Sequence, residues 1–135
     1  MMNPAMKRAQ LNREAILSAS PARLLTMLYD RLLVDLGRAE AAQTTGQWQV
    51  ASENLVHAQL IIAELISSLN TAAWSGATQL HSLYAFVTQL LIDANIKRDD
   101  ALTRQAIALM EPLRRTWHEA ASASATPMSG GDQLG

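Results

Sequence analysis

The sequence predicts an all-α protein, an antiparallel four-helix bundle with a short N-terminal arm or helix and a disordered C-terminal tail. Two observations carry this prediction: four stretches repeat apolar residues at steps of three and four, and the connections between them are short. We expect the bundle to occupy residues 20–120 and the arm, helical in part, to occupy residues 1–19. The tail, residues 121–135, has small and polar residues and no periodic apolar face.

The first helix of the bundle is expected to begin at Ser20 and Pro21. A serine side chain accepts a hydrogen bond from a free amide at a helix start, and proline at the first helical position removes no bond. The stretch "TTGQW" (44–48) ends the helix, and its Gly46 suits the left-handed backbone common after a helix. The apolar face in between consists of Leu25, Leu28, Leu32, Leu36 and Ala39.

The second helix has the most regular apolar spacing of the four, which is typical of a seam between packed helices. The stretch "NTAAWSGAT" (70–78) separates it from the third helix. The seam positions of the second helix are Ala51, Leu55, Ala58, Ile62, Leu65 and Leu69, and those of the third are Leu80, Leu83, Val87, Leu90 and Ala94.

The fourth helix follows the turn "KRDD" (97–100), where Asp99 or Asp100 can cap its first turn. We expect Pro112 to bend the last turns, because proline removes one helical hydrogen bond. The apolar positions of this helix are Leu102, Ala106, Leu109, Leu113 and Trp117.

Composition restricts the class of protein. A chain of 135 residues with 49% apolar residues suits one globular domain. The 11 basic and 12 acidic side chains give a net charge of −1, which argues against an extended nucleic-acid surface. There is no cysteine, and no apolar run resembles a signal peptide or a membrane span. We therefore expect a soluble protein that stays in the cytoplasm.

Catalytic and metal-binding patterns are missing from the sequence. The histidines His57, His81 and His118 fall on three different expected helices, without the Glu-x-x-His pairs of a di-iron bundle. No nucleophile motif and no glycine-rich phosphate loop occurs. We expect no enzyme, no cofactor and no metal, with a histidine phosphotransfer module using His57 or His81 as a remote alternative, since the residues after His57 are apolar where such modules usually place lysine and glycine.

Several helices carry a second apolar stripe beside the seam. A bundle core needs roughly three apolar positions in seven, and "LIIAELI" (60–66) exceeds that. The surplus indicates either a wide core or a groove for a partner helix. Its members are Leu24, Met27, Leu33, Leu60, Ile61, Ile66, Tyr84, Phe86 and Leu91.

Four blocks of the sequence resemble the FliS family of flagellar secretion chaperones. They are "ASPARLLTMLYD" (19–30), "AQLIIAELISSLN" (58–70), "LHSLYAFVTQLLIDAN" (80–95) and "LRRTW" (113–117), in the order and spacing of that family. The resemblance implies a cytoplasmic helical bundle that binds the C-terminal segment of flagellin, prevents its premature polymerisation and delivers it to the flagellar type III export apparatus. It implies no cofactor and no membrane insertion, and a client-free homodimer is an open possibility.

The resemblance and the second stripe together suggest a set of partner-binding residues. Tyr29 and Asp30 are included because they match the first family block, although core packing is the better interpretation of both tyrosines in the set. A helical adaptor or regulator of flagellar assembly with another client is the alternative function. The proposed contacts are Leu24, Met27, Tyr29, Asp30, Leu60, Ile61, Tyr84, Val87 and Leu91.

Overall fold

The computed structural model describes residues 3–18, 20–69 and 76–125, and within them every regular element is a helix. The all-α prediction is therefore confirmed. In chain order the helices are α1 (Pro4–Ser18), α2 (Pro21–Thr44), α3 (Trp48–Ser67), α4 (Gly76–Ile96) and α5 (Asp100–Ala125).

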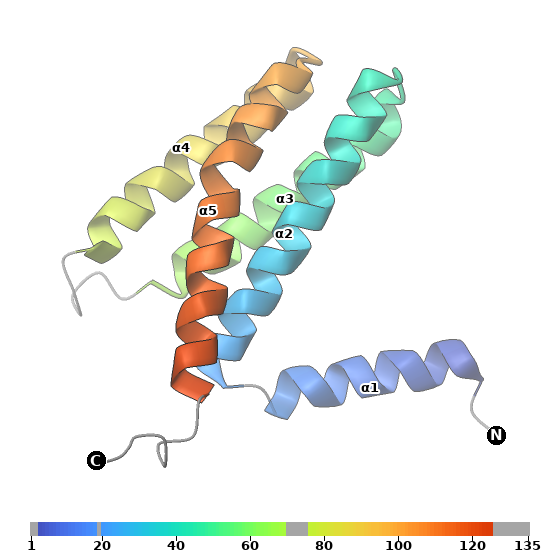
Figure 1. Cartoon of the computed structure of the whole chain (residues 1–135). Helices are drawn as coiled ribbons and strands as arrows, with labels where there is room; N and C mark the ends of the chain where they lie inside the picture. Colours follow the sequence, from blue (N-terminus) through green and yellow to red (C-terminus); the bar gives the residue numbers. More distant parts are fainter. Residues whose placement is uncertain (1–2, 19, 70–75, 126–135) are drawn as a thin grey trace.

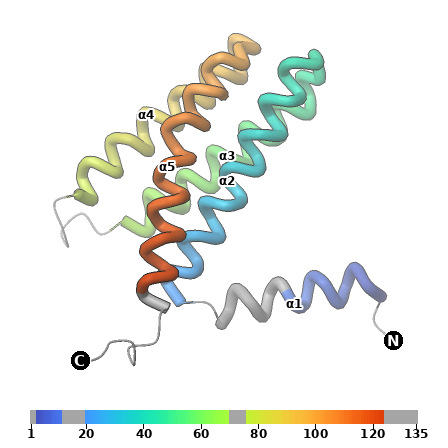
Figure 2. Tube along the Cα trace, in the orientation of Figure 1, coloured from blue at the N-terminus to red at the C-terminus, as the bar shows by residue number. Residues whose placement is uncertain are grey.

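Helices α2 to α5 form the predicted four-helix bundle (Figure 1). α2 packs against both α3 and α5, and α4 packs against the same two helices from the other side. α2 and α4 therefore lie diagonally across the core. The α2–α3 and α4–α5 turns lie at one end of the bundle, and the start of α2 lies with the end of α5 at the other (Figure 2).

The N-terminal arm is a helix that projects away from the bundle (Figure 1). Asn3 begins it, because its side-chain oxygen accepts a 2.8 Å hydrogen bond from the Met6 amide, and Pro4 follows at the first helical position. The described side chains of α1, residues 4–11, are exposed. Its first half therefore adds nothing to the bundle core.

The expected helix boundaries are confirmed at three places. Ser20 Oγ accepts a 3.2 Å hydrogen bond from the Arg23 amide at the start of α2. Gly46 has a φ of 72°, the left-handed conformation that ends the preceding helix. Asp99 Oδ1 accepts a 2.9 Å hydrogen bond from the Ala101 amide at the start of α5. Local capping chemistry thus sets these ends, as the sequence predicts.

The core is built from the predicted seams of all four helices. Burial of one large aliphatic side chain contributes about 1.5–3 kcal/mol, so the seams stabilise the fold only when they close on one another. A polar layer crosses the core near the turn end, where Gln43 donates to the Ala94 carbonyl at 3.2 Å and Thr103 donates to Gln43 at 2.7 Å. The fully buried aliphatic residues include Leu32, Leu36, Leu55, Ile62, Leu65 and Met110.

Helix α5 is longer than the sequence suggested. It continues without interruption to Ala125, so the domain boundary expected after residue 120 falls inside it. It also passes through Pro112, while the bend expected there stays a prediction. Residues 126–135, the rest of the predicted tail, lie outside the described part of the chain.

Candidate functional site

An apolar groove lies at the end of the bundle where α2 begins and where α3 and α5 end. Its volume is about 560 Å³. We call it the apolar groove, and its lining residues are Pro21, Ala22, Leu24, Leu25, Leu28, Glu64, Ser68, Trp117, Ala120 and Ala121.

The groove results from the sizes of the side chains at this end of the bundle. Leu24, Leu25 and Leu28 present an apolar wall from the first two turns of α2, and Trp117 provides an aromatic wall from α5. Beyond Trp117, α5 contributes only Ala120 and Ala121 to the lining. Their small side chains leave space that larger side chains would fill. Glu64 of α3 and Ser68, which directly follows α3, add a polar edge. This combination of apolar walls and few polar groups fits an amphipathic helix.

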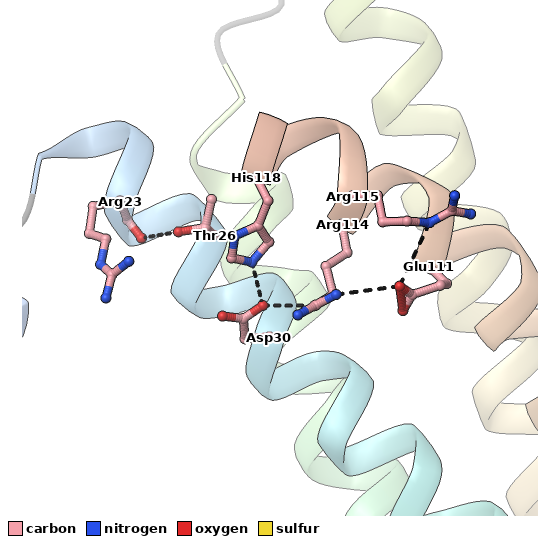
Figure 3. A network of polar contacts seen from close by, with 7 residues as sticks. All are labelled: Arg23, Thr26, Asp30, Glu111, Arg114, Arg115 and His118. Atoms are coloured by element: carbon pink, nitrogen blue, oxygen red, sulfur yellow. Dashed lines mark hydrogen bonds and ion pairs between the residues drawn. The ribbon is translucent and has the colours of Figure 1, made fainter. Parts of the chain in front are cut away.

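A polar network joins α2 to α5 next to the groove (Figure 3). Asp30 Oδ1 accepts a 2.8 Å hydrogen bond from Arg114 Nε and lies 2.6 Å from His118 Nε2. Glu111 Oε1 extends the network, at 3.4 Å from Arg114 Nη1 and 3.9 Å from Arg115 Nε. Because His118 follows Trp117 directly, the network fixes the part of α5 that supplies the aromatic wall.

The network also determines the ionisation of Asp30. Partial burial raises the pKa of this carboxyl, but the hydrogen bonds and positive charges of His118 and Arg114 outweigh it, and the net pKa lies below the usual aspartate value. Asp30 is therefore an anion at neutral pH and links the two helices. Sequence reasoning placed Asp30 in contact with a partner, whereas here its carboxylate is bonded to α5.

A second charged cluster joins α2 to α3. Asp35 is fully buried, and its carboxylate accepts a 2.9 Å hydrogen bond from Arg31 Nε and a further bond from His57 Nδ1. The side chains of Arg31 and His57 are about half exposed and cover the buried carboxylate. His57 thus has a structural partner. This bond accounts for the presence of a histidine among apolar residues, and no phosphotransfer role is needed to explain it.

Five of the nine predicted partner-binding residues lie in the core. Each helix of the bundle contacts two neighbours, so parts of the second apolar stripes of α3 and α4 turn inward with the seams. At most 6% of each of these residues is exposed, so they pack inside the bundle here, and their contact with a partner stays a prediction. They are Tyr29, Ile61, Tyr84, Val87 and Leu91.

The other four predicted residues lie in different surroundings. Leu24 lines the apolar groove, and Asp30 belongs to the network beside it. Met27 is half-buried but is not part of the groove lining. Leu60 is 64% exposed on α3, away from the groove lining. Leu24 is therefore the one residue of the predicted partner-binding set that lines the apolar groove.

Sequence reasoning missed most of the groove. Leu25, Leu28 and Trp117 line the groove, but sequence reasoning assigned them to the apolar faces of their helices. A usable signal was present, because an antiparallel bundle places the start of α2 beside the end of α5, where Trp117 precedes the alanines at 120 and 121. Small residues after an aromatic one predict a hollow at that end.

The described residues contain no group of three or more histidine, aspartate or glutamate side chains arranged to hold a metal ion. None of their helices is long and apolar enough to cross a membrane.

Comparison with known proteins identifies the family. The sequence model of the family described as "Flagellar protein FliS" matches residues 2–124 of the chain. The chain belongs to the FliS family. The match covers all five helices except the last residue of α5, so it includes both the groove and the α1 helix.

Two curated FliS proteins are similar over most of their length. The "Flagellar secretion chaperone FliS" of Escherichia coli (strain K12) is 33% identical over 114 residues, which cover 82% of this chain and 84% of the relative. The protein of the same name from Bacillus subtilis (strain 168) is 29% identical over 108 residues, or 80% of each chain. FliS proteins are chaperones and not enzymes, which confirms the expectation of a non-enzymatic protein.

Proposed function

We propose that this protein is a cytoplasmic flagellar export chaperone that binds the C-terminal segment of flagellin. In this role it prevents premature polymerisation of flagellin and delivers it to the flagellar type III export apparatus. The apolar groove between α2, α3 and α5 is the structural observation that carries the proposal, since it offers a client a preformed apolar surface. Membership of the FliS family supports the same role.

Binding would use the groove as a receptor for one amphipathic helix of the client. Apolar anchors of that helix pack against Leu24 and Leu28 on one side and Trp117 on the other. The client segment loses conformational freedom when it folds on the groove, and this cost offsets part of the gain from apolar burial. A client held in this way is protected from assembly and still released without ATP.

The groove also suggests how the client-free protein behaves. An uncovered apolar surface of this kind favours self-association. We also propose that two copies pair through the groove when no client is present. Flagellin then replaces the second copy.

The test is a calorimetric titration with full-length flagellin and with flagellin that lacks its C-terminal segment. One-to-one binding with a negative heat-capacity change, lost on truncation, supports the proposal. Absence of binding to full-length flagellin contradicts it. Binding to another flagellar component instead would identify an adaptor or regulator.

A matched pair of variants locates the binding surface. Leu24→Glu places a carboxylate on the apolar wall of the groove, whereas Ile96→Glu places one on an exposed apolar residue at the other end of the bundle. The first should weaken flagellin binding at least about tenfold, because the charge must be buried under the client. The second should leave it unchanged. Circular dichroism of both variants verifies that the bundle is intact.

A further inference from the structure

A second cavity lies at the opposite end of the bundle from the apolar groove, between the α2–α3 and α4–α5 turns. Its volume is about 250 Å³. Unlike the groove, it is lined mainly by polar side chains. We call it the polar cavity, and its walls include Gln43, Trp48, Ser52, Asn95 and Arg98.

The floor of the polar cavity is fixed by hydrogen bonds between helices. The buried Gln43 side chain donates to the Ala94 carbonyl and accepts from the Thr103 hydroxyl. Asn95 Nδ2 donates to Ser52 Oγ at 3.2 Å, which joins α4 to α3. The polar groups of the floor are therefore held in place before any ligand arrives.

Arg98 supplies the positive charge of the cavity. Its backbone has a φ of 51°, in the left-handed region that favours glycine. Its guanidinium carbon lies 5.2 Å from the centre of the Trp48 ring, a cation–π contact between the two turns. A cation–π contact leaves the N–H donors of a guanidinium able to bind an anion, because the ring does not accept them as a carboxylate would.

The nearby carboxylates do not use these donors. Asp99 caps the Ala101 amide, and Asp100 pairs with Arg104 at 2.8 Å. Glu53 accepts from Gln49 at 3.1 Å. Throughout the described part of the chain, no carboxylate lies within ion-pair distance of Arg98, although most arginines of the bundle have such a partner.

We propose that the polar cavity is a second binding site, which receives the carboxylate of an acidic side chain from a partner polypeptide. The carboxylate would take the two in-plane donors of Arg98, the geometry that planar guanidinium groups favour. The amides and hydroxyl of Asn95, Gln49 and Ser52, which also line the cavity, would donate to the lone pairs of the carboxylate that Arg98 leaves free.

The size of the cavity favours a side chain over a cofactor. A water molecule occupies about 30 Å³ of liquid, so the space holds roughly eight waters, and it is smaller than the pockets of about 300–1,000 Å³ that bind drug-sized ligands. Arg98 itself is exposed, so a side chain on a docked polypeptide reaches it without opening the bundle. The site lies at the other end of the bundle from the groove and does not depend on flagellin binding.

The experiment is an NMR titration of the ¹⁵N-labelled full chain with the peptide acetyl-Gly-Asp-Gly-amide. The Asn peptide of the same length is the uncharged control, and sodium acetate and inorganic phosphate are added separately at equal ionic strength. The Trp48 indole resonance, assigned by its loss in Trp48→Phe, and the Arg98 side-chain resonance report binding. We expect both to move saturably with the Asp peptide and not with the Asn peptide.

Two variants separate the specific site from general charge effects. Arg98→Gln should lower the affinity for the Asp peptide at least about tenfold, because it removes the bidentate donor. Lys97→Gln removes a neighbouring exposed charge that does not line the cavity and should leave the affinity unchanged. Leu24→Glu, in the apolar groove, should also leave it unchanged, which makes this test independent of the proposed chaperone role.

The other outcomes overturn the proposal. If acetate binds as tightly as the Asp peptide, the site takes free carboxylates and the polypeptide assignment is wrong. If phosphate binds more tightly than either, the assignment to carboxylates is wrong. If no ligand gives a saturable shift at Trp48, or if Arg98→Gln and Lys97→Gln weaken binding equally, the cavity is not a binding site.

Discussion

The hydroxyl oxygens of Tyr29 on α2 and Tyr84 on α4 lie 2.6 Å apart in the middle of the bundle. The two ring centroids are 6.5 Å apart with an interplanar angle of 53°, and at most 1% of either residue is exposed. Because α2 and α4 are diagonal, this hydrogen bond crosses the whole core. Burial raises the pKa of both phenols, so both remain neutral and one can donate to the other.

Removal of both hydroxyls should destabilise the bundle by less than the sum of the two single removals. Tyr29→Phe leaves the Tyr84 hydroxyl buried without its partner, which costs about 1–3 kcal/mol. The reverse variant, Tyr84→Phe, has the same effect on Tyr29. In the double variant neither unsatisfied group remains, so the loss should be smaller than the sum of the two single losses. Urea denaturation of the four proteins measures the coupling, and additive losses would show that the bond contributes nothing.

Two neighbouring residues on α3 should lose very different amounts of stability on the same substitution. Ile61 is 6% exposed and packs in the core, whereas Leu60 is 64% exposed. Ile61→Asp buries an unpaired carboxylate and should cost about 3–5 kcal/mol. Leu60→Asp should change stability by about 0.5 kcal/mol or less. Thermal unfolding followed by circular dichroism distinguishes them. Equal stability of the two variants would contradict the orientation of α3.

Ile61 illustrates what the sequence can and cannot predict. The spacing of apolar residues determines that "LIIAELI" is helical, and capping residues such as Ser20 and Asp99 determine where helices begin. The same spacing does not reveal how wide the buried face is, because that depends on how many neighbours each helix contacts. Tyr84 and Ile61 lie beside a seam in sequence and became core for this reason.

The groove was harder to predict than the fold. It depends on where three helix ends lie relative to one another, and this arrangement brings together lining residues that are distant in sequence, such as Leu28 and Trp117. Its polar neighbours were equally non-local, since the bond between Asp30 and Arg114 joins residues 84 positions apart. A local pattern identifies Asp30 as polar on a helix but gives no partner for it.

Two glycines should differ in the sign of their response to alanine. A Cβ added at Gly37 or at Gly46 meets no atom within 4 Å, so backbone conformation alone decides the effect. Gly46 has a positive φ, and Gly46→Ala should cost about 1–2 kcal/mol. Gly37 lies inside α2, and Gly37→Ala should stabilise the bundle by about 0.5–1 kcal/mol. Urea midpoints that move in the same direction for both variants would contradict this.

The link between Asp30 and α5 should make part of the free energy of unfolding depend on pH. Because hydrogen bonds and charge from His118 and Arg114 lower the net pKa of Asp30 against the opposing effect of burial, folding favours its ionised form. That contribution is fully present above the unfolded aspartate pKa of about 3.9 and is lost as pH falls through the lower folded value. The pair is partly exposed, so the effect should be about 1 kcal/mol or less.

Asp30→Asn tests this dependence, because it keeps the size of the side chain and removes its titration. The unfolding free energies of the variant and the original protein, measured in urea from pH 6 to pH 2.5, should differ most at the upper end and converge in acid. Asp93→Asn is the matched control, since the Asp93 carboxylate contacts the Gln89 amide and forms no ion pair with any described residue. A gap between the original protein and Asp30→Asn that stays constant down to pH 2.5 would show that the carboxylate acts only by its shape, and that charge does not hold α5 against α2 beside the groove.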